Sequence, residues 1–86
     1  MISFSDWNAL LLYADELEEK VFKEHKVRIV IRPYNTAMYE KGMEITLYDR
    51  KGMAFKKPYC TGALSNLMDG KIIMADAVKR VLNENV

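Results

Sequence analysis

The sequence predicts a small two-layer α+β domain: an N-terminal helix, a three-stranded antiparallel sheet, and one broken or two short C-terminal helices. Two changes of hydrophobic period carry this prediction. Apolar residues recur every three or four positions up to residue 25, alternate with polar residues from residue 26, and return to helical spacing after residue 60. Helices segregated onto one face of a small sheet give this architecture. The 86 residues are expected to form a single domain, 1–86.

The first 25 residues are expected to form a helix that begins after Ser3. Serine is a favoured N-cap residue, and Ile2 and Trp7 have the spacing of a hydrophobic staple across the cap. Glu18 falls within the apolar stripe, so we expect it either to pair with His25 or a basic strand residue, or to reach solvent at the helix edge. The stripe itself consists of Phe4, Trp7, Leu10, Leu11, Ala14, Leu17, Val21 and Phe22.

Three strands are expected in the middle of the chain. In the first, residues 27, 29 and 31 face one way and residues 28, 30 and 32 the other, and Pro33 ends the strand. A loop over residues 34–42 leads to a second strand over residues 43–48. Residues 49–52 have the composition of a hairpin turn, with Gly52 at its end. The third strand is then expected at residues 53–56, before Pro58.

The C-terminal part is expected to be helical. Thr61 can cap a short helix that stops at Asp69 and Gly70. A last helix follows, whose apolar stripe is Met74, Ala77, Val78, Val81 and Leu82. Residues 71–74 can instead form a fourth strand that leads into this helix.

Charge is distributed unevenly along the chain, although the formal net charge is only +1. Residues 1–25 hold two lysines against six acidic residues, residues 26–59 hold eight basic against three acidic residues, and residues 60–86 balance. An acidic helix is therefore followed by a basic sheet. This asymmetry serves either solubility and attraction between the two layers, or a docking face on the sheet.

The residue inventory does not favour an enzyme. Cys60 and His25 are the only candidates for a nucleophile and its base, and no glycine-rich turn or oxyanion donor accompanies them. The acidic residues of the first helix share one exposed face rather than opposing each other across a cleft. No phosphate-binding loop or metal-ligand spacing occurs, so we expect no catalytic residue, no cofactor and no metal.

The sequence also bears on the cellular compartment. The longest apolar run, residues 9–14, is far shorter than the roughly 20 residues of a membrane span. No basic start or small-residue cleavage site marks a signal peptide. A single cysteine suits a reducing interior. We therefore expect a cytoplasmic protein without a membrane partner.

The remaining signal is a basic and aromatic face on the sheet. By alternation, three basic side chains share one strand face with Tyr48, and two more lie in the adjacent hairpin turn. Tyrosine and arginine are enriched at protein interfaces, and they also stack on bases and hold phosphates in single-stranded nucleic acids. The predicted partner-binding residues are Arg28, Arg32, Tyr48, Arg50, Lys51 and Lys56.

The element order αβββα resembles that of double-stranded RNA-binding domains, and the likeness covers most of the chain. Those domains carry a basic cluster at the start of the last helix and a histidine between the first strands. Here residues 61–66 carry no charge and residues 34–42 contain no histidine. No RNA-binding residue is carried over from this resemblance.

We therefore expect a non-catalytic protein that binds another macromolecule. The leading hypothesis is an accessory or inhibitor protein of the phage or mobile-element type, which blocks a complex such as a host defence complex by occupying an acidic surface. The alternative is a nucleic-acid-binding module that uses the same basic face. Both the basic sheet and the acidic first helix are candidate docking surfaces. Apolar residues outside the predicted core stripes, among them Leu12 and Met38, are available for contact with a second copy, so a homodimer is one alternative.

Overall fold

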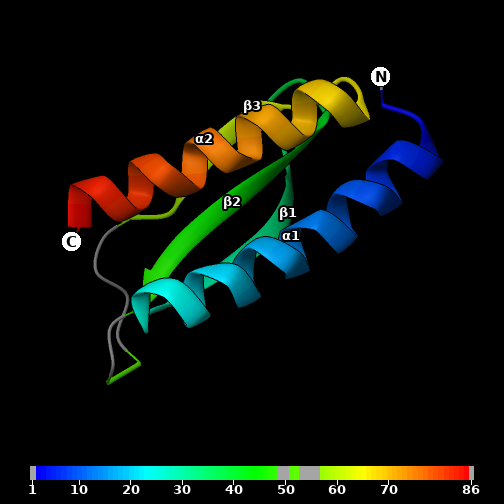
Figure 1. Ribbon diagram of the computed structural model, residues 1–86. Coiled ribbons are helices and arrows are strands. Elements are labelled where there is room, and N and C mark those ends of the chain that lie inside the picture. The colour runs from blue at the N-terminus through cyan, green and yellow to red at the C-terminus, as the bar shows by residue number, and fades with distance from the viewer. Residues whose placement is uncertain (1, 49–50, 53–56, 86) are drawn as a thin grey trace.

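The computed structural model describes residues 2–48, 51–52 and 57–85 (Figure 1). It confirms the predicted α+β fold class, with an N-terminal helix, a three-stranded antiparallel sheet and a C-terminal helix. The elements are α1 (Phe4–His25), β1 (Arg28–Asn35), β2 (Lys41–Tyr48), β3 (Tyr59–Ala63) and α2 (Leu67–Asn85).

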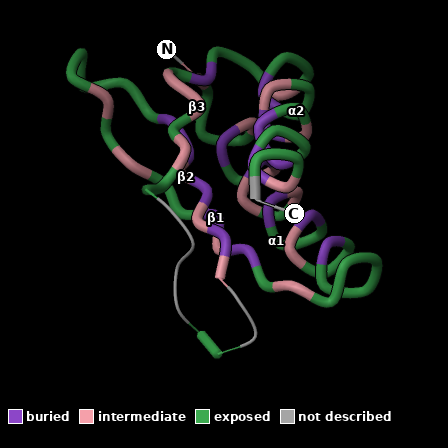
Figure 2. The backbone as a smooth tube through the Cα atoms, turned by 90° about the vertical axis from the view of Figure 1, so that its left-hand side faces the viewer, coloured by how far each residue is buried: buried purple, intermediate pink, exposed green. Residues whose placement is uncertain are grey.

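The elements form two layers (Figure 2). The sheet has the order β1-β2-β3, and both neighbouring pairs are antiparallel. Helix α1 packs against β1, and α2 packs against β2 and β3, on the same side of the sheet. Among the described residues, no element covers the other side, which we call the bare face. It presents Arg28, Val30 and Arg32 of β1 and Glu44, Thr46 and Tyr48 of β2.

The core lies between the helices and the covered face of the sheet. Leu10, Ile29, Met43, Ile45 and Met74 are the largest side chains with less than 2% exposure. Each aliphatic side chain buried in this way contributes about 1.5–3 kcal/mol through the hydrophobic effect. The predicted alternation of the first two strands is confirmed, because residues 29, 31, 43, 45 and 47 are all buried.

Helix α1 begins and ends as its sequence predicts. The Ser3 hydroxyl accepts a hydrogen bond from the Asp6 backbone N–H (3.2 Å), which confirms the N-cap. Lys26 ends the helix in the left-handed conformation (φ 58°), and its N–H donates to the Phe22 carbonyl. Phe4 and Phe22, predicted in the buried stripe, are instead 80% and 58% exposed. They lie in the first and last turns, and α1, at about 33 Å, is longer than the strands beneath it, at about 27 Å.

The third strand of the described structure is β3, where a helix capped by Thr61 was predicted. The predicted third strand, residues 53–56 with Lys56, lies outside the described residues. The Thr61 hydroxyl accepts a hydrogen bond from the Met43 N–H (3.0 Å) and donates to the Gly62 carbonyl (2.8 Å). Thr61 therefore joins two strands at the register shift between β2 and β3 instead of capping a helix.

Gly42 allows an aromatic side chain to cross from β1 to β3. The Tyr34 hydroxyl accepts a hydrogen bond from the Gly62 N–H (3.1 Å). A Cβ atom at Gly42 would collide with the Gly62 carbonyl oxygen and lie 2.7 Å from Cε1 of the Tyr34 ring. Only glycine leaves room here for the ring and for the close approach of β3.

Helix α2 is one continuous helix, so the predicted stop at Asp69 and Gly70 is wrong, and residues 71–74 are helical rather than a strand. A Cβ atom at Gly70 would lie 2.7 Å from Cδ1 and 2.9 Å from Cδ2 of Leu10. Gly70 is therefore the site where α1 and α2 approach closely, and this contact outweighs the low helix propensity of glycine. Asn66 begins the helix, because its side-chain oxygen accepts from the Asp69 N–H (2.9 Å).

Asp6 ties the starts of the two helices together. Its carboxylate oxygen accepts a hydrogen bond from the Leu67 N–H (3.2 Å), which is one of the unpaired amides in the first turn of α2. A carboxylate at this position also interacts favourably with the helix dipole. The two helices therefore start at the same end of the molecule, as Figure 1 shows.

Candidate docking surface on the sheet

The structure brings together three of the six residues that the sequence singled out. Arg28 of β1 lies directly opposite Tyr48 of β2, and Arg32 lies opposite Glu44. Val30 and Thr46 form the pair between them. All of these residues are on the bare face, where Arg28 and Arg32 are exposed and Tyr48 is half-buried.

The other three predicted residues belong to the segment after β2. Lys51 is exposed in a turn and directly precedes Gly52, which lines the same cavity as the arginines. Arg50 and Lys56 lie outside the described residues.

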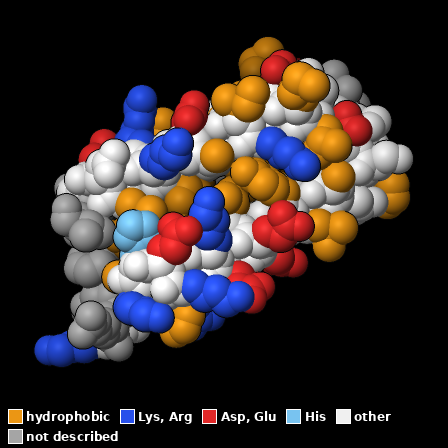
Figure 3. Space-filling view, viewed as in Figure 1, with side chains coloured by type: hydrophobic (Ala, Val, Ile, Leu, Met, Phe, Trp, Pro, Cys, Tyr) orange, Lys and Arg blue, Asp and Glu red, His pale blue; other side chains and the backbone are white. Residues whose placement is uncertain are grey.

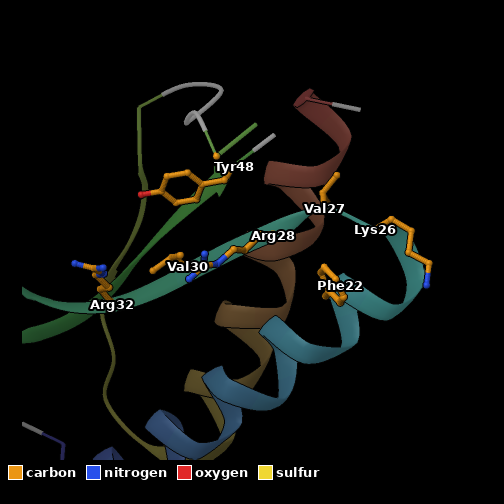
Figure 4. Close-up of a pocket in the computed structure, with 8 residues that line it drawn as sticks. Phe22, Lys26, Val27, Arg28, Val30, Arg32 and Tyr48 are labelled. Carbon is orange, nitrogen blue, oxygen red and sulfur yellow. The ribbon is translucent and has the colours of Figure 1, made fainter. Parts of the chain in front are cut away.

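A cavity of about 500 Å³ lies beside these residues, where the end of α1 meets β1 (Figure 4). Figure 4 shows Arg28, Val30 and Arg32 in a row along β1, with Tyr48 on one side of them and Phe22 and Lys26 on the other. We call it the sheet-edge cavity. It is lined by Phe22, Lys26, Val27, Arg28, Val30, Arg32, Tyr48 and Gly52.

The lining combines positive charge with apolar surface. Lys26, Arg28 and Arg32 supply three cations, and none of the described residues that line the cavity is acidic. The rings of Phe22 and Tyr48 supply flat contact area at a low cost in side-chain entropy. This combination suits a ligand that carries both a carboxylate and an apolar group, because arginine binds carboxylates with two parallel hydrogen bonds.

Glu18 lies behind the two arginines on α1. Burial, and to a lesser extent the neighbouring carboxylate of Asp15, raises the pKa of Glu18, while Arg28, Arg32 and a hydrogen bond with the Ile31 backbone oppose this shift. Arg28 and Arg32 therefore act on Glu18 through their charge, but among the described residues Glu18 forms no ion pair within 4.0 Å with them or with His25. His25 instead lies with its Nε2 3.9 Å from a carboxylate oxygen of Glu24.

The outer edge of β1 is poorly suited to pairing with a further strand. Glu18 already hydrogen-bonds to the backbone of Ile31, and Pro33 has no N–H to donate. These are common ways of protecting an edge strand. A partner on this side of the sheet is therefore held by side chains rather than by main-chain pairing.

Sequence reasoning missed the part of the cavity that comes from the end of α1. Phe22 was assigned to the core, and Lys26 and Val27 were assigned no role in binding. The left-handed conformation of Lys26 turns the chain from α1 into β1 and places these residues beside Arg28. Position 26 follows the last residue of α1, where a left-handed conformation usually comes with glycine. The sequence has lysine at this position and therefore gives little indication of the turn.

Cys60 and His25, the two residues considered as a nucleophile and its base, lie in different layers of the molecule. Cys60 is exposed on β3, on the bare face opposite Glu44, and His25 ends α1 in the other layer. In the part of the chain that the structure describes, no group of three His, Cys, Asp or Glu residues is placed to hold a metal ion. Neither described helix has the length and hydropathy of a membrane span.

Comparison with known proteins identifies no relative: no family model, no curated protein and no solved structure matches this chain. The element order remains similar to that of double-stranded RNA-binding domains. The first turn of α2 carries Asp69, however, where those domains carry a basic cluster.

Proposed function

We propose that this protein is a non-catalytic binding protein that docks its bare face onto an acidic surface of another protein. The observation that carries the proposal is the sheet-edge cavity, in which three cations surround apolar side chains. Interfaces gain most of their binding energy from such clusters of arginine and aromatic residues. By occupying the partner's surface, the protein would block other molecules that bind there. It would thus act as an inhibitor of the phage or mobile-element type.

The charges around the arginines favour a protein over a nucleic acid. Glu44 lies directly opposite Arg32 on the bare face. A nucleic acid carries a phosphate at every nucleotide, so a strand along the bare face would meet the Glu44 carboxylate beside Arg32. A protein partner places its acidic residues only where the arginines can receive them.

A second copy of the chain is a poor partner for this surface. The exposed side of α1 carries a shallow hollow lined by three glutamates and two lysines, and Lys23 already pairs with Glu19 (3.0 Å), so little acidic charge there is left for the arginines of another copy. That side belongs to the helical layer, opposite the bare face (Figure 2). Two copies joined face to helix would leave one free surface of each kind, and the assembly would grow into an open chain.

The proposal is tested by fluorescence anisotropy with the full chain. The probe is a short fluorescein-labelled peptide in which aspartates and glutamates flank one phenylalanine. We expect binding in the micromolar range, and we expect the R28E/R32E variant to bind at least about tenfold more weakly, since two of the three cations that line the cavity are reversed. Lys79→Glu is the charge control, because Lys79 is exposed on α2, away from the bare face.

Circular dichroism melting of each variant separates loss of binding from loss of folding. Labelled single-stranded and double-stranded DNA and RNA are measured in parallel at two salt concentrations. Tighter binding of a nucleic acid, with a steep salt dependence, would replace the protein partner with a nucleic acid. Equal affinity of wild type and the folded R28E/R32E variant for the peptide would refute the site.

A further inference from the structure

The end of the molecule opposite the sheet-edge cavity exposes large apolar side chains. Phe4, Met38 and Tyr39 are 80%, 79% and 90% exposed. The start of α1, the turn between β1 and β2, and the start of α2 meet at this end (Figures 1 and 2). Hydrophobic side chains also gather over the first half of α2 in Figure 3, where Met68 and Ile72 are exposed. We call the surface formed by Ile2, Phe4, Met38 and Tyr39 the aromatic end.

Tyr39 is held in an unfavourable conformation at this end. The Thr36 hydroxyl accepts from the N–H groups of Met38 (3.3 Å) and Glu40 (3.2 Å), and the Tyr39 N–H donates to the Thr36 carbonyl (3.0 Å). This ordered turn places Tyr39 at φ 61°, in the left-handed region. The conformation costs about 1–2 kcal/mol for a residue with a side chain, and glycine or asparagine tolerates it better.

The hydrogen bonds of the Thr36 turn hold this conformation, and the turn projects Tyr39 into solvent, where the residue is 90% exposed. Strained residues of this kind concentrate at binding sites. The Tyr39 side chain is therefore available for burial in another molecule, and tyrosine is among the residues that contribute most at interfaces.

The same end also contains a hollow that can receive a ring. It has a volume of about 230 Å³, and its apolar lining includes Ile2, Phe4 and the buried residues Trp7 and Leu64. Tyr39 stands at its rim. One surface therefore carries both a protruding aromatic ring and, beside it, a hollow with apolar and polar lining residues, and a twofold contact between identical surfaces requires such self-complementarity.

The rim of the hollow also carries one charge of each sign, so two copies can pair their opposite charges. Glu40 and Lys41 are adjacent, are both exposed, and both line the hollow. The Lys41 ammonium also lies 5.3 Å from the centre of the Trp7 ring. In a twofold contact, Glu40 of one copy faces Lys41 of the other, and the reverse contact forms at the same time.

We propose that the aromatic end is a homodimer interface, in which the Tyr39 ring of each copy enters the hollow of the other and Glu40 pairs with Lys41 across the twofold axis. The occupant is a second copy because ring, hollow and both charges are present on the one surface. The interface leaves the bare face of each copy free. A dimer would then present two docking faces. Once one face has bound a partner that carries two sites, the other face would bind the second site at an increased effective concentration.

The experiment is a charge-swap mixing assay followed by sedimentation velocity. We expect wild type to dimerise reversibly, and E40K and K41E each to dimerise at least about tenfold more weakly, because each creates two like-charge contacts. In an equimolar mixture of the two variants, both cross contacts again join opposite charges. We therefore expect the mixture to regain dimers, as heterodimers, at close to the wild-type affinity.

Two further variants make the assay specific. Tyr39→Asn keeps a residue that tolerates the left-handed conformation but removes the ring, so we expect it to remain folded and to dimerise at least about tenfold more weakly. R28E/R32E is expected to dimerise like wild type, so the interface and the proposed docking function can fail separately. Wild type that stays monomeric up to about 1 mM, or a charge-swap mixture that does not regain dimers, would overturn the proposal.

Discussion

The two faces of the sheet differ sharply along a single strand. On β2, Met43, Ile45 and Leu47 point toward the helices and are 0–3% exposed. Their neighbours Glu44, Thr46 and Tyr48 are only half-buried on the bare face. The covered face therefore holds the fold together. The bare face contributes little to the core, so its side chains are available for binding.

The largest expected effect comes from two adjacent residues that point to opposite faces. Ile45→Ala removes a side chain that is 1% exposed, and we expect it to lower the free energy of unfolding by about 3 kcal/mol, within the 2–5 kcal/mol range of such truncations. Thr46→Ala, one residue along on the bare face, is expected to cost less than about 1 kcal/mol. Urea denaturation of both variants measures the difference. Similar losses for the two would contradict the division between the faces.

A smaller effect is expected where the helices meet above the covered face. Gly70→Ala would gain about 1 kcal/mol of helix propensity, but the new methyl group would collide with Leu10, which has no exposed surface. We expect a net loss of about 1–2 kcal/mol in the free energy of unfolding. Chemical denaturation of Gly70→Ala in the wild-type and Leu10→Ala backgrounds forms a double-mutant cycle. The loss should disappear in the Leu10→Ala background, and a loss of equal size there would exclude the collision as its cause.

The smallest expected change in stability comes from Glu18, which lies on α1 beside the edge of β1. Burial and Asp15 raise its pKa above the usual 4.5, so the protonated carboxyl stabilises the folded state at low pH. This contribution is complete below the pKa of the unfolded chain and is lost as the pH rises through the raised pKa. The stability of wild type relative to Glu18→Gln should therefore fall as the pH rises from below the usual 4.5 through the raised pKa. Urea denaturation at both ends of this range checks the sign, and a relative rise would contradict it.

The sequence predicted the elements whose patterns are strong and missed those fixed by contacts between distant residues. Alternation was sufficient for β1 and β2, because their inner faces are apolar and their outer faces polar. Strand β3 has no such pattern: it is a short edge strand, and it owes its place to pairing with β2 and to the Thr61 hydrogen bond with Met43. The continuity of α2 depends on the contact between Gly70 and Leu10, which are sixty residues apart in sequence.

The candidate docking surface was predictable to a similar extent. Alternation placed Arg28, Arg32 and Tyr48 on one face, and helical periodicity placed Glu18 within the apolar stripe of the first helix. The register that sets Arg28 opposite Tyr48 depends on the turn around Thr36 and is not encoded in the strands alone. Phe22 could not be assigned to the cavity, because helical periodicity does not show where a helix extends beyond its sheet.

The most direct test of the central claim is a ¹H–¹⁵N correlation spectrum of the full chain, titrated with the acidic peptide. A docking surface on the bare face predicts that the largest shift changes fall on the amides of Arg28, Val30, Arg32, Thr46 and Tyr48, and that the outer side of α2, including Lys79, remains unchanged. Shift changes confined to α1 and α2, with the bare face unaffected, would contradict the account.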